Sequence, residues 1–302
     1  MENITLLDGG TGHLLSERIA EVLPDFDHPM WSSGIIESHP ELVKAVHEEF
    51  IAVGSQILFS NTYSLHFRTI NEDEIKFIHD LMLENVMILE DLANKWNVKY
   101  CISIGPVAVK FHDCSEYSAS YLDDGRINDD DIYDHYNVLL QQVQKIKKNF
   151  VAFETIPSFI EVKIALKVLQ NYPNVKCFLT VVATSIEQTA HGDSIMDIAK
   201  IVSGNNQIIA FGVNCSDPRL CLPIAERLSP MLTQKLIMKP NDGRIFDQEQ
   251  KRYTGDRYDL RQDLAELFKN KVHFIGGCCS VGPDIIQSYQ RFLQCGNCVS
   301  QF

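Results

Sequence analysis

The sequence predicts an α/β fold, a single-domain (β/α)8 barrel of the TIM type. Short apolar runs rich in Ile, Val and Phe alternate with longer amphipathic segments along the 302 residues. The runs are too continuous for strands with one exposed face, which indicates parallel strands buried on both faces. Eight such runs alternating with helices are typical of this barrel. We expect one domain over residues 1–302, with residues 295–302 as a mobile tail.

Eight segments are expected to form the strands of the barrel. In chain order they are Ile4–Leu7, Gln56–Asn61, Cys101–Gly105, Phe150–Thr155, Cys177–Ala183, Ile208–Asn214, Lys235–Lys239 and Val272–Ile275. A doubly wound open sheet is the main alternative architecture. Residues 8–12 follow the first strand, but their sequence, Asp-Gly-Gly-Thr-Gly, lacks the G-x-G-x-x-G spacing of dinucleotide-binding sheets.

Two helices are indicated by apolar residues at three- and four-residue steps, over residues 43–53 and 75–93. Helix-start signals add to this pattern. They are found at Ser38 with Glu41 and at Ser158 with Glu161, which fit a capping box, and at Pro218 and Pro283, which suit a first helical turn.

The charge balance and composition argue against several classes of protein. Asp and Glu number 40 against 27 Lys and Arg, and the formal net charge of −13 disfavours nucleic acid or an anionic membrane surface as the main partner. No run approaches the roughly 18 apolar residues of a membrane helix. The first residues lack the basic and apolar segments of a signal peptide. We therefore expect a cytoplasmic protein, a monomer or small homo-oligomer, that acts on small molecules.

Polar or reactive residues follow seven of the eight expected strands. They are Asp8-Gly9-Gly10, Asn61-Thr62-Tyr63, Gly105-Pro106, Glu154-Thr155, Asn214-Cys215, Lys239-Pro240-Asn241 and Gly276-Gly277-Cys278-Cys279. In such barrels the active site lies at the face formed by the carboxyl ends of the strands. The pattern therefore predicts one functional site at that face.

Nine cysteines, an odd number in a chain too large to need disulfides, are expected to be reduced. Cys215 follows the sixth strand, and Cys278 and Cys279 follow the eighth, so a closed barrel would bring them together. Gly276 and Gly277 would allow the backbone bend that lets both adjacent cysteines reach one metal ion. Three thiolates leave one tetrahedral position on Zn²⁺ open, the pattern of a catalytic site.

The charge of such a site indicates its chemistry. Zn²⁺ with three thiolates carries one net negative charge, so it is a weak Lewis acid for water but can still bind a further thiolate. A free thiol with a pKa near 8.5 is only about 3% ionised at pH 7, and metal binding deprotonates it. A cationic alkyl donor would be attracted to this site and would lose its charge on transfer. A zinc hydrolase or deaminase is an alternative, although the Pro-Cys-x-x-Cys deaminase pattern is absent.

The other cysteines have simpler interpretations. Cys101, Cys177 and Cys221 are interpreted as small buried apolar residues. Cys295 and Cys298 form a C-x-x-C that could be a redox pair or half of a metal site, and an ordinary tail is favoured. The segment His112-Asp113-Cys114 could supply ligands, but its many aspartates, including residues 129–131, favour a solvated acidic loop.

Two of these motifs together carry a family resemblance. Gly212-Val213-Asn214-Cys215, followed by Gly276-Gly277-Cys278-Cys279, resembles the zinc signature of the homocysteine S-methyltransferase family. Four further segments are similar to family motifs, so the resemblance covers nearly the whole chain. These are residues 8–12, 31–54, 154–157 and 240–243.

The resemblance implies a zinc-dependent (β/α)8 barrel, a homocysteine-binding domain that methylates homocysteine to methionine. It implies that Cys215, Cys278 and Cys279 bind Zn²⁺. For the acceptor, the resemblance implies that Asp8 and Glu154 hold the substrate ammonium and that backbone N–H groups of Gly9, Gly10 and Thr11 bind its carboxylate. It also implies that Asn214 shapes the turn beside the metal. Trp31 and Tyr63 are implied to line the donor pocket.

The chain departs from the family at two donor-side loops. Residues 107–110 and Lys239 stand where an aromatic residue is frequent. The chain also lacks the C-terminal extension of betaine-dependent relatives and the cobalamin and folate modules of large methionine synthases. The compact chain favours S-methylmethionine or S-adenosylmethionine as the donor, whereas the two loop differences leave the donor open. Betaine as donor, another thiol or a selenol as acceptor, and a redox or metal-storage protein are the alternatives.

Overall fold

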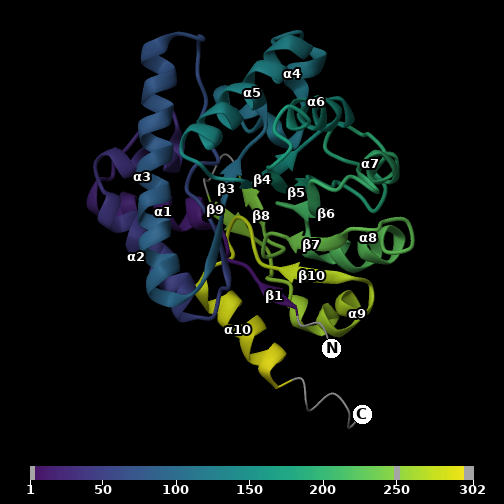
Figure 1. Cartoon of the computed structure of the whole chain (residues 1–302). Helices are drawn as coiled ribbons and strands as arrows, with labels where there is room; N and C mark the ends of the chain where they lie inside the picture. The colour runs from purple at the N-terminus through teal and green to yellow at the C-terminus, as the bar shows by residue number, and fades with distance from the viewer. Residues whose placement is uncertain (1–3, 248–251, 296–302) are drawn as a thin grey trace.

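Eight parallel strands form a barrel whose outer surface is covered by helices (Figure 1). The computed structural model describes residues 4–247 and 252–295. The strands are hydrogen-bonded in the order β1-β10-β7-β6-β5-β4-β3-β2. A parallel bridge between Leu7 and Ile57 joins the two ends of this order, β1 and β2, and closes the ring. The predicted (β/α)8 barrel is therefore confirmed.

Each of the eight predicted segments overlaps a strand of the barrel. The strands are β1 (Thr5–Leu6), β2 (Ile57–Phe59), β3 (Lys99–Ile104), β4 (Phe150–Ile156), β5 (Lys176–Val181), β6 (Ile208–Asn214), β7 (Lys235–Lys239) and β10 (Val272–Ile275). Between β7 and β10 the chain adds an antiparallel pair, β8 (Ile245–Asp247) and β9 (Arg252–Thr254), which the sequence pattern did not indicate.

Helices follow most of the strands. They are α1 (Thr11–Val22), α2 (Pro40–Ala52), α3 (Glu72–Trp96), α4 (Ser120–Asp123), α5 (Asp129–Lys145), α6 (Phe159–Leu169), α7 (Ile195–Val202), α8 (Cys221–Leu228), α9 (Leu264–Lys269) and α10 (Pro283–Gln294). Short 3-10 segments cover Trp31–Glu37, Val107–Lys110, Ser115–Tyr117, Pro218–Leu220 and Leu260–Asp263. Within residues 4–247 and 252–295, no helix is long and apolar enough to cross a membrane.

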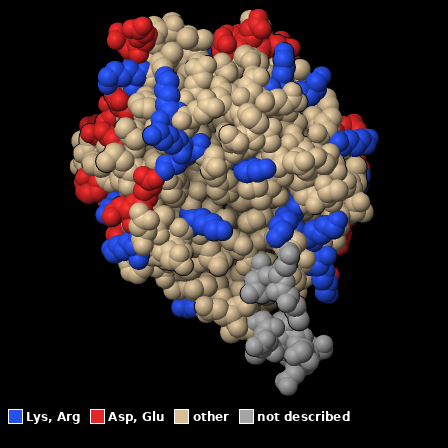
Figure 2. Space-filling model, viewed as in Figure 1, with Lys and Arg blue, Asp and Glu red and all other residues tan. Residues whose placement is uncertain are grey.

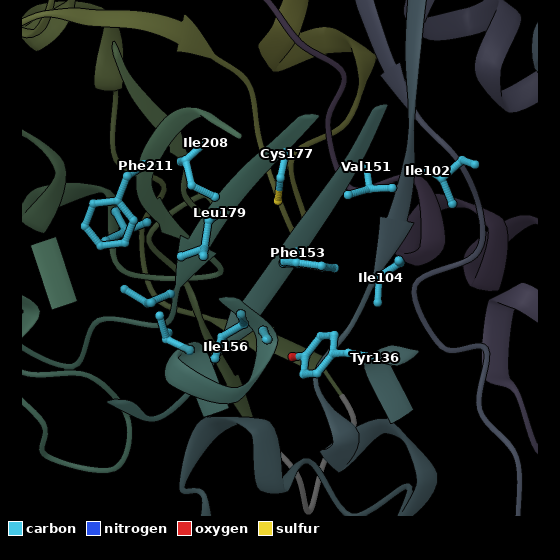
Figure 3. Packing of buried hydrophobic residues seen from close by; sticks show 14 of the residues in the cluster. Ile102, Ile104, Tyr136, Val151, Phe153, Ile156, Cys177, Leu179, Ile208 and Phe211 are labelled. Carbon is cyan, nitrogen blue, oxygen red and sulfur yellow. The ribbon is translucent and has the colours of Figure 1, made fainter. Parts of the chain in front are cut away.

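Alternation along the strands divides the apolar residues between two cores. One set fills the barrel itself: Leu7, Ile57, Phe59, Cys101, Ala152, Phe178, Ala210, Ile237 and Phe274. Their neighbours along the strands, such as Ile102, Val151 and Phe153, point outward and pack beneath the helices (Figure 3). Because successive side chains on a strand point to opposite faces, every strand is buried on both sides. The continuous apolar runs follow from this arrangement.

Three local expectations need correction. Ser38 is not a helix cap, because α2 begins at Pro40 and His39 is the capping position. Pro218 begins a 3-10 segment that precedes α8. The aspartates at residues 129–131 are not a loop but the first turn of α5, where Asn128 and Asp131 form a capping box. Negative charge at a helix N-terminus is favoured by the helix dipole.

On the face shown in Figure 2, basic side chains are scattered over a largely uncharged centre, and acidic side chains lie mainly toward the edges. The expected tail falls mostly on residues 296–302, which, with Cys298, lie outside the described residues.

Candidate metal centre

Three cysteine sulfurs converge at the carboxyl ends of β6 and β10. The Sγ atoms of Cys215, Cys278 and Cys279 all lie within 4.8 Å of one another. Around a tetrahedral Zn²⁺ with Zn–S bonds of about 2.3 Å, sulfur ligands are about 3.8 Å apart. The three sulfurs are therefore close enough to become ligands of one ion after a small separation of the Cys215 and Cys278 sulfurs, which are bonded to each other. The expectation that a closed barrel brings these residues together is confirmed.

Two of these sulfurs are oxidised in the structure. Cys215 and Cys278 form a disulfide with a Cα–Cα separation of 5.2 Å, and Cys279 is a free thiol. The expectation of nine reduced cysteines is therefore wrong for this pair. The physical reason is that a separation suited to a shared metal ion also suits a disulfide. Because metal ligation needs thiolates, the pair must be reduced before both sulfurs can bind an ion.

The backbone holds the cysteines at sharp turns. Cys215 has a φ of 48°, and its N–H donates to the Lys239 carbonyl at 3.1 Å. The Cys278 N–H donates to the Pro240 carbonyl at 2.7 Å. Both cysteine loops are thus tied to the end of β7, the strand between them.

Gly276 and Gly277 contribute space rather than unusual backbone angles. Neither has a positive φ, unlike Cys215. A Cβ on Gly276 would lie 2.5 Å from the Asp8 carbonyl, and one on Gly277 would collide with Val281. The expected role of these glycines as a flexible bend is therefore corrected to close approach between the cysteine loop and its neighbours.

Asn214 links the cysteine loop to β4. Its Nδ2 donates to Thr155 Oγ1 at 2.7 Å and lies 3.8 Å from Cys278 Sγ, and its Oδ1 accepts from the Thr155 N–H at 2.7 Å. Thr155 has a φ of 63°, which is costly for a β-branched residue. The two hydrogen bonds hold Thr155 in this conformation, next to Glu154.

Asp8 and Glu154 lie inside the barrel mouth on either side of Lys239. Lys239 Nζ is 3.0 Å from Glu154 Oε2 and 3.6 Å from Asp8 Oδ1, and it lies 3.2 Å from the centre of the Phe59 ring. Ser103 Oγ donates to Glu154 Oε1 at 2.5 Å. The structure thus brings the two predicted carboxylates together, and it places between them Lys239, whose sequence position marked it as a strand-end residue and as a family departure but not as their partner.

Burial and neighbouring charges shift the pKa values of Asp8 and Lys239 in opposite directions. Burial raises the pKa of Asp8 to about 7, although the Lys239 ammonium opposes the rise. For Lys239, burial lowers the pKa, but the Glu154 and Asp8 carboxylates outweigh it, and the pKa lies above its ordinary value. Lys239 is therefore a buried ammonium ion that these carboxylates stabilise.

Two of the N–H groups expected to bind a carboxylate are already engaged. The Gly10 N–H donates to the Val281 carbonyl at 2.9 Å, and the Thr11 N–H donates to the Gly9 carbonyl at 3.0 Å. A Cβ on Gly10 would collide with the Cys278 carbonyl. This loop therefore packs directly against the cysteine loop.

Aromatic residues surround the third cysteine. Tyr117 Oη is 3.9 Å from Cys279 Sγ, and Tyr253 of β9 hydrogen-bonds to the same thiol. The predicted residue Tyr63 is half-buried and hydrogen-bonds to Thr155. Trp31 is exposed, with a φ of 43°. Sequence reasoning missed Tyr117 and Tyr253, because neither follows a strand of the barrel.

Comparisons with known proteins point to one family. A sequence model of the family described as homocysteine S-methyltransferase matches residues 5–293. The chain is 24% identical to homocysteine S-methyltransferase 1 of Brassica oleracea var. italica, over 96% of this chain and 93% of that protein. It is also 24% identical to betaine-homocysteine S-methyltransferase of Drosophila melanogaster, over 94% and 92%. The metallated form of the homocysteine methyltransferase MmuM from Escherichia coli has the same fold, with a TM-score of 0.79, 20% identity and 96% of each chain covered.

Proposed function

The chain belongs to the homocysteine S-methyltransferase family and is therefore a methyltransferase, and from this premise we propose its reaction in detail. A methyl group passes from a cationic donor, S-methylmethionine or S-adenosylmethionine, to the sulfur of L-homocysteine, giving methionine. The observation that carries the proposal is the convergence of Cys215, Cys278 and Cys279 at the barrel mouth.

The three cysteines fit a catalytic zinc site. Once Cys215 and Cys278 are reduced, they and Cys279 offer three neighbouring thiolates to one ion and leave a fourth position for a ligand from solution. Zn²⁺ bound there would keep the acceptor thiol ionised at neutral pH. Asn214, which contacts Cys278, keeps that ligand in place while the substrates exchange.

The residues around the cysteines orient the two substrates. Glu154 and Asp8 attract the ammonium group of homocysteine, and their fixed position aims its sulfur toward the cysteine cluster. Tyr117 and Tyr253 contact Cys279 through their hydroxyl groups, and Tyr63 lies nearby. Aromatic rings attract sulfonium and quaternary ammonium groups by about 0.5–2 kcal/mol. These aromatic residues support a cationic donor, and betaine is a further candidate of the same chemistry.

A donor panel tests the proposal. Reduced, zinc-loaded protein is incubated with homocysteine and S-methylmethionine, S-adenosylmethionine or betaine, and methionine is quantified. We expect methionine with a sulfonium donor. Cys215→Ala should lose bound zinc and activity together, because two thiolates hold the ion too weakly. Cys221→Ala, which removes a buried thiol of α8 outside the cluster, should keep both. Full activity in a zinc-free Cys215→Ala protein would refute the scheme.

The Cys215–Cys278 disulfide favours one alternative, a redox-responsive barrel without methyl transfer. That function predicts reversible oxidation of the cysteines and no methionine from any donor. Mass spectrometry of the thiol state, run beside the donor panel, separates the two. An acceptor other than homocysteine, such as a selenol, would appear as product only when that acceptor replaces homocysteine in the panel.

A further inference from the structure

Most acceptor positions on Asp8 and Glu154 are already used within the chain. Glu154 accepts from Ser103 through Oε1 and from Lys239 through Oε2. Asp8 Oδ2 accepts from the Phe59 N–H at 2.7 Å. Asp8 Oδ1 has no hydrogen-bond partner among the described residues, and the Lys239 ammonium lies 3.6 Å away. A substrate ammonium that approaches these carboxylates therefore meets a lysine in the position between them.

The Lys239 ammonium is buried and is held in this position by its neighbours. Its side chain is 4% exposed and that of Asp8 is fully buried. The ammonium faces Glu154 on one side, Asp8 on another and the Phe59 ring on a third. The ammonium donates a hydrogen bond to Glu154, while Asp8 and the Phe59 ring attract it by charge from its other sides. Lys239 thus acts as a counter-ion of the carboxylates and does not reach toward the solvent.

We propose that Lys239 is a specificity-determining residue for the acceptor. Its ammonium supplies from within the chain the cation that Asp8 and Glu154 would otherwise take from the acceptor's α-ammonium. When both carboxylates are ionised, they and Lys239 together carry one negative charge, against two for the carboxylates alone. Because the pKa of Asp8 is about 7, this count applies above neutral pH, where the comparison is made. This inference rests on the proposed transfer to a small thiol and deepens it, because it names the acceptor class.

The consequence is a weakened requirement for an amino group on the acceptor. An entering ammonium gains less attraction from one net charge than from two, and it is repelled by the ammonium already present. A thiol with a carboxylate but no amine avoids this repulsion. We therefore expect the protein to accept 4-mercaptobutanoate, which is homocysteine without its α-amino group, as well as homocysteine.

The test compares the two thiols on one preparation. Binding to reduced, zinc-loaded protein is measured by calorimetry, and kcat/KM is measured with a sulfonium donor. For the wild type we expect the preference for homocysteine to stay within about tenfold, equal to about 1.4 kcal/mol. Lys239→Met should raise that preference at least about tenfold, because two bare carboxylates then bind the α-ammonium directly.

Controls keep the result independent of folding. Each preference is a ratio within one protein sample, so a partly inactive fraction cancels. Lys239→Gln, which removes the charge but keeps an N–H donor, should shift the preference in the same direction as Lys239→Met. Lys235→Met, at the exposed start of the same strand, should leave it unchanged.

Two results would overturn the inference. One is a preference of the wild type for homocysteine over 4-mercaptobutanoate of a thousandfold or more. This result can be obtained with the wild type alone. The other is a preference that stays the same or falls when Lys239 loses its charge. If no donor methylates either thiol, the proposed reaction fails, but the calorimetric preference still decides the role of Lys239.

Discussion

Individual residues at the barrel mouth each contact more than one neighbouring residue. Asn214 satisfies the backbone and side chain of Thr155 and also contacts Cys278. Its position just before the first cysteine of the cluster indicated a structural role, but its partner on β4 is 59 residues away in sequence. No local pattern identifies a contact of that kind. The same limit explains why Lys239 was predicted at a strand end but its pairing with Asp8 and Glu154 was not.

Replacing Asn214 should therefore weaken the fold as well as the site. Asn214→Ala leaves the buried N–H of Thr155 without an acceptor, at a cost of about 1–3 kcal/mol. We expect the free energy of unfolding, measured by urea denaturation, to fall by that amount. Asn206→Ala, a change at an exposed residue, should have little effect. A loss in Asn214→Ala no larger than in Asn206→Ala would show that the Thr155 contacts add no stability.

Secondary structure elements were predictable where the signal is local. All eight strands appear at the continuous apolar runs, and the helices around residues 43–53 and 75–93 appear where apolar periodicity placed them. The β8–β9 pair was missed because its three-residue strands have no buried repeat of their own. Helix starts were less certain, since the Ser-x-x-Glu pattern at Ser38 and at Ser158 looks the same in sequence.

Of Ser38 and Ser158, only Ser158 caps a helix, so alanine variants of the two serines can be compared directly. Ser158 Oγ accepts from the Glu161 N–H at the start of α6, whereas α2 has no side-chain cap. Ser158→Ala should lower the free energy of unfolding by about 0.5–2 kcal/mol. Ser38→Ala should change it little, because Pro40 already fixes the first turn of α2. Equal losses in the two variants, followed by thermal or urea unfolding, would contradict this assignment.

At the scale of the whole molecule, closure of the barrel creates the site. Cys215 and Cys278 are 63 residues apart in sequence, and they meet because β6 and β10 flank β7 in the ring. The strand order of a barrel follows from the sequence pattern, so this meeting was predictable. The oxidation state was not, because composition reports the usual state of cysteines in a compartment and not the distance between two sulfurs.

The two states of the cysteine pair should differ in their response to metal. An ion that binds the folded chain and not the unfolded chain stabilises it by about 2.7 kcal/mol at a free concentration 100 times the Kd. With reduced protein, zinc should therefore raise the melting temperature, and a chelator should reverse the rise. With the Cys215–Cys278 disulfide intact, only Cys279 of the cluster is a thiol, so zinc should have little effect.

Variants of the cluster distinguish this effect from zinc binding elsewhere. Cys279→Ala leaves the disulfide-forming pair in place but removes the third ligand, so its zinc-dependent rise should shrink even when the protein is reduced. Cys114→Ala, at an exposed cysteine outside the cluster, should behave as the wild type. Differential scanning fluorimetry with and without a reductant measures the wild type and both variants. An equal rise in reduced and oxidised protein would place the stabilising ion away from the three sulfurs, since the disulfide removes two of the thiolates that the site requires.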